Sequence, residues 1–259
     1  MSEIIIIAAI ALFAVPGILF YLFQHKLVFS PHYYPERSFF AEHSHDYQFQ
    51  HLNVAPGIEL EGMIYSPENP IATVLYFGGK EQDSVALIGR LSQRYPNVRI
   101  VTFNYRGYGH SGGVPREAAI LSDAVVLYDW AVQRYDYVDL LGYSLGSSVA
   151  AYVASKRTTG KVVLVSAFDS AQALIKSKTA IVPKWLIRCR FETVEYVKDI
   201  SAPVYLFTTL DDEVIPQSHI DNLRGHIRNL AGTKAFSGYN HAQLLFSDEL
   251  KIELDKVFS

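Results

Sequence analysis

A serine flanked by glycines is the first candidate for chemistry in this chain. Residues 142–146 read Gly-Tyr-Ser-Leu-Gly, with Ser144 at the centre. A strand-like apolar stretch, residues 137–141, precedes the serine, and a helical pattern over residues 145–156 follows it. A serine on such a tight turn presents its hydroxyl at the edge of a sheet, with the helix amino terminus aimed at any oxyanion that develops nearby. The pattern therefore predicts Ser144 as a nucleophile.

A serine nucleophile needs a general base, most often a histidine. In the strand–turn–helix arrangement the acid and then the histidine follow the serine along the chain. Of nine histidines, His219, His226 and His241 follow Ser144. The first two lie within a polar helical stretch, where solvation at the surface explains both. His241 comes after the last predicted strand and directly before the last predicted helix, so it is the candidate base.

Three carboxylates follow the strand-like stretch 204–208 and could orient that base. They are Asp211, Asp212 and Glu213. A solvated acidic turn explains two of the three without any chemical role. Asp169, which follows the preceding strand, is a rival outside this loop. Spacing alone does not choose between Asp211 and Asp212.

Bringing these residues together requires a scaffold that places several strand ends side by side. Residues 47–54 and 58–65 have strand character around Pro56-Gly57, which predicts a hairpin. Strands and helices then alternate. The strands are expected at residues 73–77, 98–103, 137–141, 161–165, 204–208 and 234–236, and the helices at residues 85–95, 117–134, 145–156, 220–228 and 242–258. This order predicts an α/β fold with a mostly parallel sheet, helices on both faces and the active site at the carboxyl ends of the strands.

Near its amino terminus the chain carries an uncharged apolar run of 20 residues, Ile4–Phe23. As a helix this run would span roughly 30 Å, the hydrocarbon thickness of a bilayer. Tyr21 and Lys26 suit a membrane interface, and Pro16-Gly17 predicts a kink. The sequence therefore predicts one transmembrane anchor helix within residues 1–25.

A cleaved signal peptide and a re-entrant hairpin at Pro16-Gly17 are the alternatives to a retained anchor. The signal peptide fits less well, because the run lacks a basic start and a cleavage site beyond it. Lys26 and Arg37 follow the run, so the positive-inside rule places the globular part in the cytoplasm. We expect a connector over residues 26–45 and one large domain over residues 46–259.

Composition excludes several other classes of protein. The chain has 259 residues, a net charge of -3 and one cysteine, Cys189, which rules out an internal disulfide and a cysteine-based zinc cluster. A pI near 6.3 argues against a nucleic-acid partner, because phosphate binding needs a clustered basic surface. With 49% hydrophobic and 19% charged residues the chain cannot be disordered.

Five motifs together resemble the alpha/beta-hydrolase superfamily, in particular its amino-terminally anchored members related to protein depalmitoylases. The motifs are Val-Leu-Tyr-Phe-Gly-Gly at 74–79, Asn-Tyr-Arg-Gly-Tyr-Gly-His-Ser-Gly at 104–112, the pentapeptide 142–146, Asp-Glu-Val-Ile-Pro at 212–216, and His241. The resemblance covers about residues 20–250. It implies an alpha/beta-hydrolase fold over residues 46–259 and selects Asp212, rather than Asp211, as the acid.

The resemblance also implies an oxyanion hole. The family usually has His-Gly-Asn after the strand at 73–77, whereas this chain has Gly-Gly-Lys at residues 78–80. Backbone N–H groups of Lys80 and Leu145 would be the two donors. The Lys80 side chain could attract an anionic substrate or point to solvent, and we expect the solvent-facing orientation. Arg106 is expected to hold loops near the site rather than to take part in chemistry.

The expected reaction is acyl transfer to water without a metal or organic cofactor. An insert at about residues 167–200 would form a small cap over the site, and its apolar residues are interleaved with basic ones. Such a cap beside a membrane anchor suggests that the partner is a small-molecule acyl ester, thioester or lipid-like substrate, cleaved through an acyl-enzyme. A serine peptidase or aminopeptidase, and a catalytically silent membrane-tethered binding protein, are the alternatives.

Overall fold

The computed structural model describes residues 15, 17–25, 28–31, 45–179 and 182–259. Most of the predicted anchor and connector, including Lys26 and Arg37, lies outside these residues, as do residues 180–181 of the predicted cap. Within the described residues, no helix has both the length and the apolar character needed to cross a bilayer. The transmembrane helix therefore stays a prediction. Residues 17–25 are helical and are called the N-terminal helix below.

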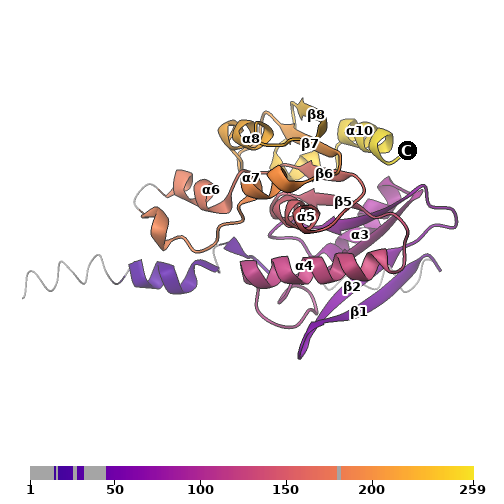
Figure 1. Ribbon diagram of the computed structural model, residues 1–259, viewed down its shortest axis with the longest axis horizontal. Helices are drawn as coiled ribbons and strands as arrows, with labels where there is room; N and C mark the ends of the chain where they lie inside the picture. The colour runs from indigo at the N-terminus through magenta and orange to yellow at the C-terminus, as the bar shows by residue number, and fades with distance from the viewer. Residues whose placement is uncertain (1–14, 16, 26–27, 32–44, 180–181) are drawn as a thin grey trace, which may run out of the picture.

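In the described part of the chain, one eight-stranded sheet forms the centre (Figure 1). Its strands are β1 (Tyr47–Ala55), β2 (Ile58–Tyr65), β3 (Ala72–Phe77), β4 (Val98–Phe103), β5 (Asp139–Tyr143), β6 (Val162–Val165), β7 (Val204–Thr209) and β8 (Leu230–Phe236). Across the sheet they follow the order β1-β2-β4-β3-β5-β6-β7-β8. The β1–β2 and β2–β4 pairs are antiparallel, and all others are parallel. The prediction of a hairpin followed by a mostly parallel sheet is confirmed.

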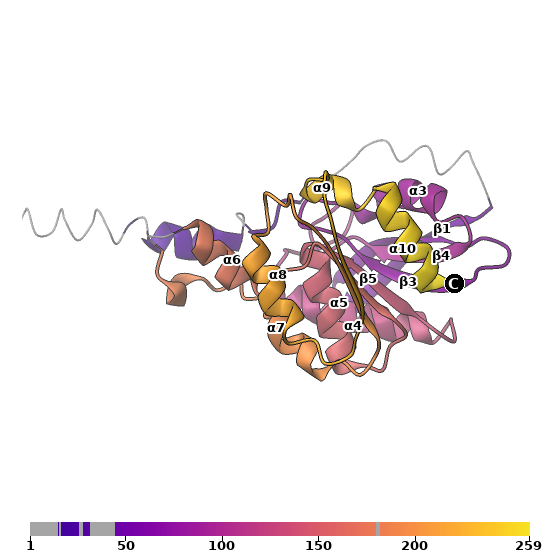
Figure 2. The same cartoon turned by 90° about the horizontal axis from the view of Figure 1, so that it is seen from above.

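Helices cover both faces of this sheet (Figure 2). The longer ones are α3 (Ser84–Arg94), α4 (Glu117–Val132), α5 (Leu145–Lys156), α8 (Gln217–Arg224) and α10 (Asp248–Phe258), with the short α9 (His241–Leu244) before α10. Buried side chains of α4, α5 and α8 belong to one hydrophobic core, and those of α3 and α10 belong to a second core. Because strands between two cores are buried on both sides, β6 is a continuous apolar run, and every residue of β5 after Asp139 is buried.

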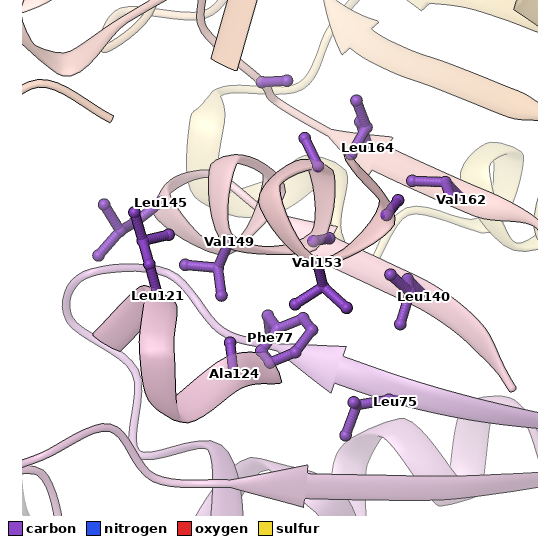
Figure 3. Close-up of a cluster of buried hydrophobic side chains, with 14 of the residues drawn as sticks. Leu75, Phe77, Leu121, Ala124, Leu140, Leu145, Val149, Val153, Val162 and Leu164 are labelled. Carbon is purple, nitrogen blue, oxygen red and sulfur yellow. The ribbon is translucent and has the colours of Figure 1, made fainter. Parts of the chain in front are cut away.

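The core on the α5 side holds the helix that begins directly after Ser144 (Figure 3). Val149 and Val153 of α5 are fully buried in one cluster with the sheet residues Leu140 and Leu164. Phe77, at the end of β3, belongs to the same cluster. Close packing of this kind leaves little freedom for α5 to shift, so the start of the helix is held at a defined position above the strand ends.

The carboxyl-terminal elements differ from the prediction in detail. The last predicted helix is in fact two, since Ser247 caps a new start by accepting a hydrogen bond from the Leu250 N–H. β8 begins at Leu230, earlier than predicted, because this edge strand is largely exposed and lacks a buried apolar pattern. The helix expected at 220–228 begins at Gln217, directly after Pro216.

The chain between β6 and β7 forms the predicted insert beyond the carboxyl ends of the strands. It contains α6 (Ala171–Lys178), the 3-10 turn η1 (Lys184–Leu186), α7 (Thr193–Tyr196) and the 3-10 turn η2 (Val197–Asp199). In Figures 1 and 2, α6 lies beside the N-terminal helix at one end of the molecule, whereas α7 packs near α5. We call the part from α6 to Phe191 the cap.

Candidate active site

Ser144 occupies a strained turn between β5 and α5. Its backbone angles are φ 52° and ψ -116°, a conformation that non-glycine residues adopt at a cost of about 1–3 kcal/mol. A Cβ atom on Gly146 would overlap the carbonyl oxygen of Phe77, and one on Gly142 would overlap the backbone of Gly146. The two glycines are therefore required for α5 to start this close to the sheet, which is what presents the Ser144 hydroxyl.

His241 contacts this hydroxyl although it lies 97 residues further along the chain. Its Nε2 lies 3.0 Å from the Ser144 Oγ. The residue opens α9, where Asn240 supplies the helix cap by accepting from the Gln243 N–H. Tyr143 donates its hydroxyl to the His241 carbonyl at 2.9 Å, and the His241 N–H donates to Glu213 at 3.0 Å. Main chain and ring are thus both held, which fixes the imidazole next to the serine.

Asp212 is the third residue in line with Ser144 and His241. Its Oδ2 lies 2.8 Å from the His241 Nδ1, and its Oδ1 accepts from the N–H groups of Val214 and Ile215 at 2.9 and 2.7 Å. The side chain is 1% exposed. The hydrogen bonds offset the cost of burying the carboxylate and aim it at the ring. Asp211 instead accepts from the Gly238 N–H at 2.6 Å, so the structure brings Asp212 and not Asp211 to His241.

Asp169 and His219 lie away from this alignment and pair with each other. The His219 Nδ1 is 2.7 Å from Asp169 Oδ1, and the Asn222 side chain donates to Asp169 Oδ2 at 2.8 Å. The surface position expected for His219 is wrong, because α8 begins earlier than predicted and turns this residue inward beside Ile220. His226 is exposed, as expected.

The loop after β3 places Lys80 at the same site. The peptide that carries the Lys80 N–H is fixed through the Gly79 carbonyl, which accepts from the Gln82 N–H at 3.2 Å. A Cβ on Gly79 would lie 3.6 Å from the Ser144 Cβ, so the loop approaches the serine closely. The Lys80 side chain pairs with Glu81 at 3.2 Å and is 44% exposed, in agreement with the solvent-facing orientation expected from the sequence.

Leu145 is the first residue of α5, a position whose N–H has no acceptor within the helix. Lys80 and Leu145 both line the cavity that Ser144 and His241 line. The two residues expected to supply the oxyanion donors therefore border the same cavity as the serine. Their role in stabilising an oxyanion stays a prediction.

Burial keeps the Tyr143 hydroxyl, which supports the His241 main chain, in its protonated form. It raises the pKa of the Tyr143 hydroxyl, and the negative charges of Asp212 and Glu213 raise that pKa further. The hydroxyl therefore remains a donor to the His241 carbonyl at ordinary pH. Sequence reasoning missed the role of Tyr143, and it named Glu213 only as a candidate acid and not as the acceptor for the His241 N–H. The position of Tyr143 directly before the nucleophile is the one signal that could have suggested its role.

Arg106 does not reach the serine. It makes a bidentate ion pair with Asp123 of α4, at 2.5 and 2.6 Å, and both side chains are largely buried. The pair ties the loop at 104–112 to α4, which agrees with the structural role expected for Arg106.

A cavity of about 700 Å³ opens beside Ser144. Its lining comes from the loops that carry Lys80, Ser144, Ile215 and His241, which we call the catalytic loops, from the cap with Phe168 just before it and, unexpectedly, from the N-terminal helix with Val28 just after it. The residues from outside the catalytic loops are Phe20, Gln24, Val28, Phe168, Ala171, Leu174, Ile175, Lys178 and Thr179. Most of these are apolar, so the space suits an alkyl chain. Among the described residues, no group of three or more His, Cys, Asp or Glu side chains could hold a metal ion.

Comparisons with known proteins give relatives but no family model that matches. The lysophosphatidylserine lipase ABHD12 of Danio rerio is 30% identical over 182 residues, which cover 58% of this chain and 48% of that protein. The alpha/beta hydrolase domain-containing protein WAV2 of Arabidopsis thaliana is 26% identical over 204 residues, covering 66% of this chain and 64% of that protein. This chain thus spans about half to two thirds of these relatives.

A solved structure with the same fold is that of the Pyrococcus furiosus esterase Pf2001. It superposes with a TM-score of 0.67 at 15% identity, covering 88% of this chain and 94% of the esterase. At this identity the likeness concerns the fold alone.

Proposed function

We propose a serine-hydrolase function for this chain, which belongs to the alpha/beta-hydrolase superfamily. The observation that carries the proposal is the unbroken line Ser144–His241–Asp212, with successive contacts of 3.0 and 2.8 Å, at the wall of an apolar cavity. A hydroxyl, an imidazole and a buried carboxylate in this order are the groups that acyl transfer needs.

In the proposed reaction His241 Nε2 removes the Ser144 proton as Oγ attacks the substrate carbonyl. Asp212 orients the ring through Nδ1 and stabilises the imidazolium that forms. The N–H groups of Lys80 and Leu145 would bind the oxyanion, and His241 then returns the proton to the leaving group. A water molecule, deprotonated by the same histidine, hydrolyses the acyl-enzyme and frees Ser144.

Carboxylic esters or thioesters with an alkyl acyl group are the proposed substrates. The cavity supports an apolar acyl part, and the lipase relative at 30% identity supports lipid-like esters. A panel of esters, thioesters and peptides tests this choice, because a peptidase would prefer the amides. The longest acyl chain accepted by the purified protein measures how much of the cavity is used.

Membrane attachment through the run Ile4–Phe23 is part of the proposal. Its support is the length of that run and the exposed apolar side chains of its described residues. The catalytic domain is proposed to face the cytoplasm. Retention in membranes after alkaline carbonate washing, followed by protease protection in sealed vesicles, tests attachment and orientation separately.

Labelling by a fluorophosphonate probe tests the nucleophile. Ser144→Ala should abolish labelling, because the phosphonate bonds to an activated serine oxygen. Ser148→Ala is the matched control: it lies one helical turn further along α5, and its buried hydroxyl has no hydrogen-bond partner among the described residues. Strong labelling of the Ser144 variant would remove Ser144 as nucleophile, and an inert wild-type protein would favour a silent binding protein.

Two neighbouring aspartates test the acid. Asp212→Asn should lower kcat on the order of a thousandfold or more, because the amide cannot stabilise the imidazolium. Asp211→Asn should leave kcat within about threefold, since that side chain contacts the exposed turn at Gly238 and not the histidine. Equal losses in the two variants would contradict the assignment of Asp212.

A further inference from the structure

The N-terminal helix is joined to the cap by a buried glutamine. Gln24 is 5% exposed, donates from Nε2 to the Leu186 carbonyl at 3.0 Å and accepts at Oε1 from the Arg188 N–H at 2.6 Å. The Arg188 guanidinium lies over the Tyr21 ring at 4.9 Å. These contacts satisfy both ends of a buried amide, so the helix and the cap segment are expected to move as one unit.

The residues after this helix reach the catalytic loops. Phe29 is 2% exposed and packs edge-on against Phe191 of the cap, with ring centroids 6.1 Å apart. The Ser30 N–H donates to the Lys80 carbonyl at 3.2 Å, where the Tyr108 hydroxyl also donates, at 2.6 Å. The amino-terminal segment is therefore part of the active-site structure and not only a tether.

The cavity beside Ser144 extends between these two elements. Phe20 and Gln24 line it from the N-terminal helix, and Leu174 and Ile175 line it from α6. Figures 1 and 2 show the two helices side by side, away from the sheet. An acyl chain attached to Ser144 would thus point toward the end of the molecule that these helices form.

The outer surface of the same end is apolar. Ile18, Leu19 and Leu22 of the N-terminal helix are 50–56% exposed, and Trp185 of η1 is 79% exposed. We call these four residues the apolar rim. Lys178, Lys184 and Arg188 are exposed in the adjoining cap. Large apolar side chains with cations beside them suit the boundary between the hydrocarbon and an anionic headgroup layer.

We propose that the apolar rim lies in the surface of a lipid bilayer, and that the acyl chain passes from that bilayer to Ser144 between the N-terminal helix and α6. The inference rests on the proposed function. A bilayer fits better than a protein partner because Ile18, Leu19 and Leu22 of the rim belong to the 20-residue uncharged run Ile4–Phe23, whose length and apolar character suit a hydrocarbon environment. The cap would then contact the membrane as well as cover the site.

Tryptophan quenching in the full-length protein tests the position of the cap. The chain has two tryptophans, Trp130 and Trp185. Trp130→Phe leaves Trp185 as the reporter, and Trp185→Phe leaves Trp130 of α4, which packs against Phe103 of β4. In vesicles of phosphatidylcholine and phosphatidylserine containing bromolipids, Trp185 should lose most of its emission and Trp130 very little.

Two results would overturn the proposal. Trp185 quenched by aqueous acrylamide but not by bromolipids would place the cap in water. Trp185 protected from both quenchers would mean that a second copy of the chain or another protein covers it.

Activity on two forms of substrate tests the entry route. Trp185→Asp should lower hydrolysis of a long-chain ester presented in vesicles on the order of tenfold, because a charge opposes burial in the interface. Hydrolysis of a soluble butyryl ester should be unchanged, since Trp185 does not line the cavity. Ile252→Asp is the control, as Ile252 is a similarly exposed apolar residue on α10.

The two substrates separate the failure of this inference from that of the proposed function. If Trp185→Asp hydrolyses both forms like the wild type, the bilayer route is wrong while the hydrolase function stands. If the wild-type protein hydrolyses neither form and resists the fluorophosphonate probe, the proposed function itself fails.

Discussion

The lack of a side chain on two glycines, Gly142 and Gly146, determines the geometry at Ser144. Gly142 and Gly146 allow α5 to start against the end of β3, and Ser144, at an unusual φ of 52°, lines the cavity with its hydroxyl beside His241. Nothing in the chemistry of these glycines contributes to the reaction. Their effect is steric, so it can be tested through stability alone.

Gly146→Ala should destabilise the fold by about 3 kcal/mol or more, because the new methyl group would meet the Phe77 carbonyl in a packed core. Gly225→Ala is the matched control. There a Cβ would meet other atoms at an ordinary 3.6 Å and φ is -65°, so the change should be within about 0.5 kcal/mol. Urea unfolding measures both. Similar midpoints for the two variants would contradict the steric explanation.

Sequence reasoning identified the nucleophile, the base and the acid, because their residue types indicate their chemistry. It did not identify the residues that support them through contacts in the folded chain. Ser144 and His241 followed from a turn motif and chain order, whereas Asp212 was chosen over Asp211 by resemblance. The supporting roles of Tyr143, Glu213 and Gln24 could not be predicted. Their contacts join segments remote in the chain, up to 164 residues apart for Gln24, and no local pattern records such a pairing.

At the scale of elements, the cap segment that ends at Phe191 is held from two sides. Gln24 accepts from the Arg188 N–H, and the Glu117 carboxylate at the start of α4 accepts from the N–H groups of Arg190 and Phe191 at 2.6 and 2.7 Å. Cys189 lies between these anchors and is 6% exposed. Its reactivity therefore reports on whether the segment stays in place.

Burial raises the pKa of the Cys189 thiol, and the Glu117 charge raises it further. Each unit of that rise removes about tenfold of the reactive thiolate, so the native protein should resist iodoacetamide at pH 8. Gln24→Ala should speed labelling, because it frees one side of the segment, whereas Gln217→Ala on the exposed surface of α8 should not. Mass spectrometry of timed samples measures both rates, and equal rates would show that Gln24 does not hold the cap.

Element boundaries were predictable where burial is strong. Residues 98–103 and 145–156 match β4 and α5 without adjustment, because both are packed on the core. β8 and the α9–α10 break were mispredicted, since an exposed edge strand and a serine cap leave little trace in the hydrophobic pattern. The contact between the N-terminal helix and the cap was likewise invisible, because the run Ile4–Phe23 reads as membrane anchor throughout.

At the scale of the whole molecule, both cores contain neutral tyrosines. Burial raises the pKa values of Tyr76 and Tyr105 well above the usual 10.0, and raises that of Tyr196 to about 12. The folded chain keeps these protons while the unfolded chain releases them near pH 10. The stability tied to them is therefore complete below pH 10 and is lost as the pH rises through the folded-state values.

Alkaline titration should therefore unfold the protein cooperatively above about pH 10. Tyrosinate absorbance from the buried rings should appear together with the loss of helical circular dichroism. Tyr76→Phe should move the transition slightly upward, because one ionisable group is removed from the core. Ionisation of the buried tyrosines well before any loss of helix would contradict their burial.

The hydrogen bond from Ser30 to the Lys80 carbonyl has a practical consequence for protein engineering. Deleting everything before residue 45 is an obvious way to make a water-soluble variant, yet it would also remove Phe20, Gln24 and Val28 from the wall of the cavity. Substrate profiles obtained with such a shortened enzyme would describe an opened pocket, and inhibitors selected against it would be fitted to the wrong shape.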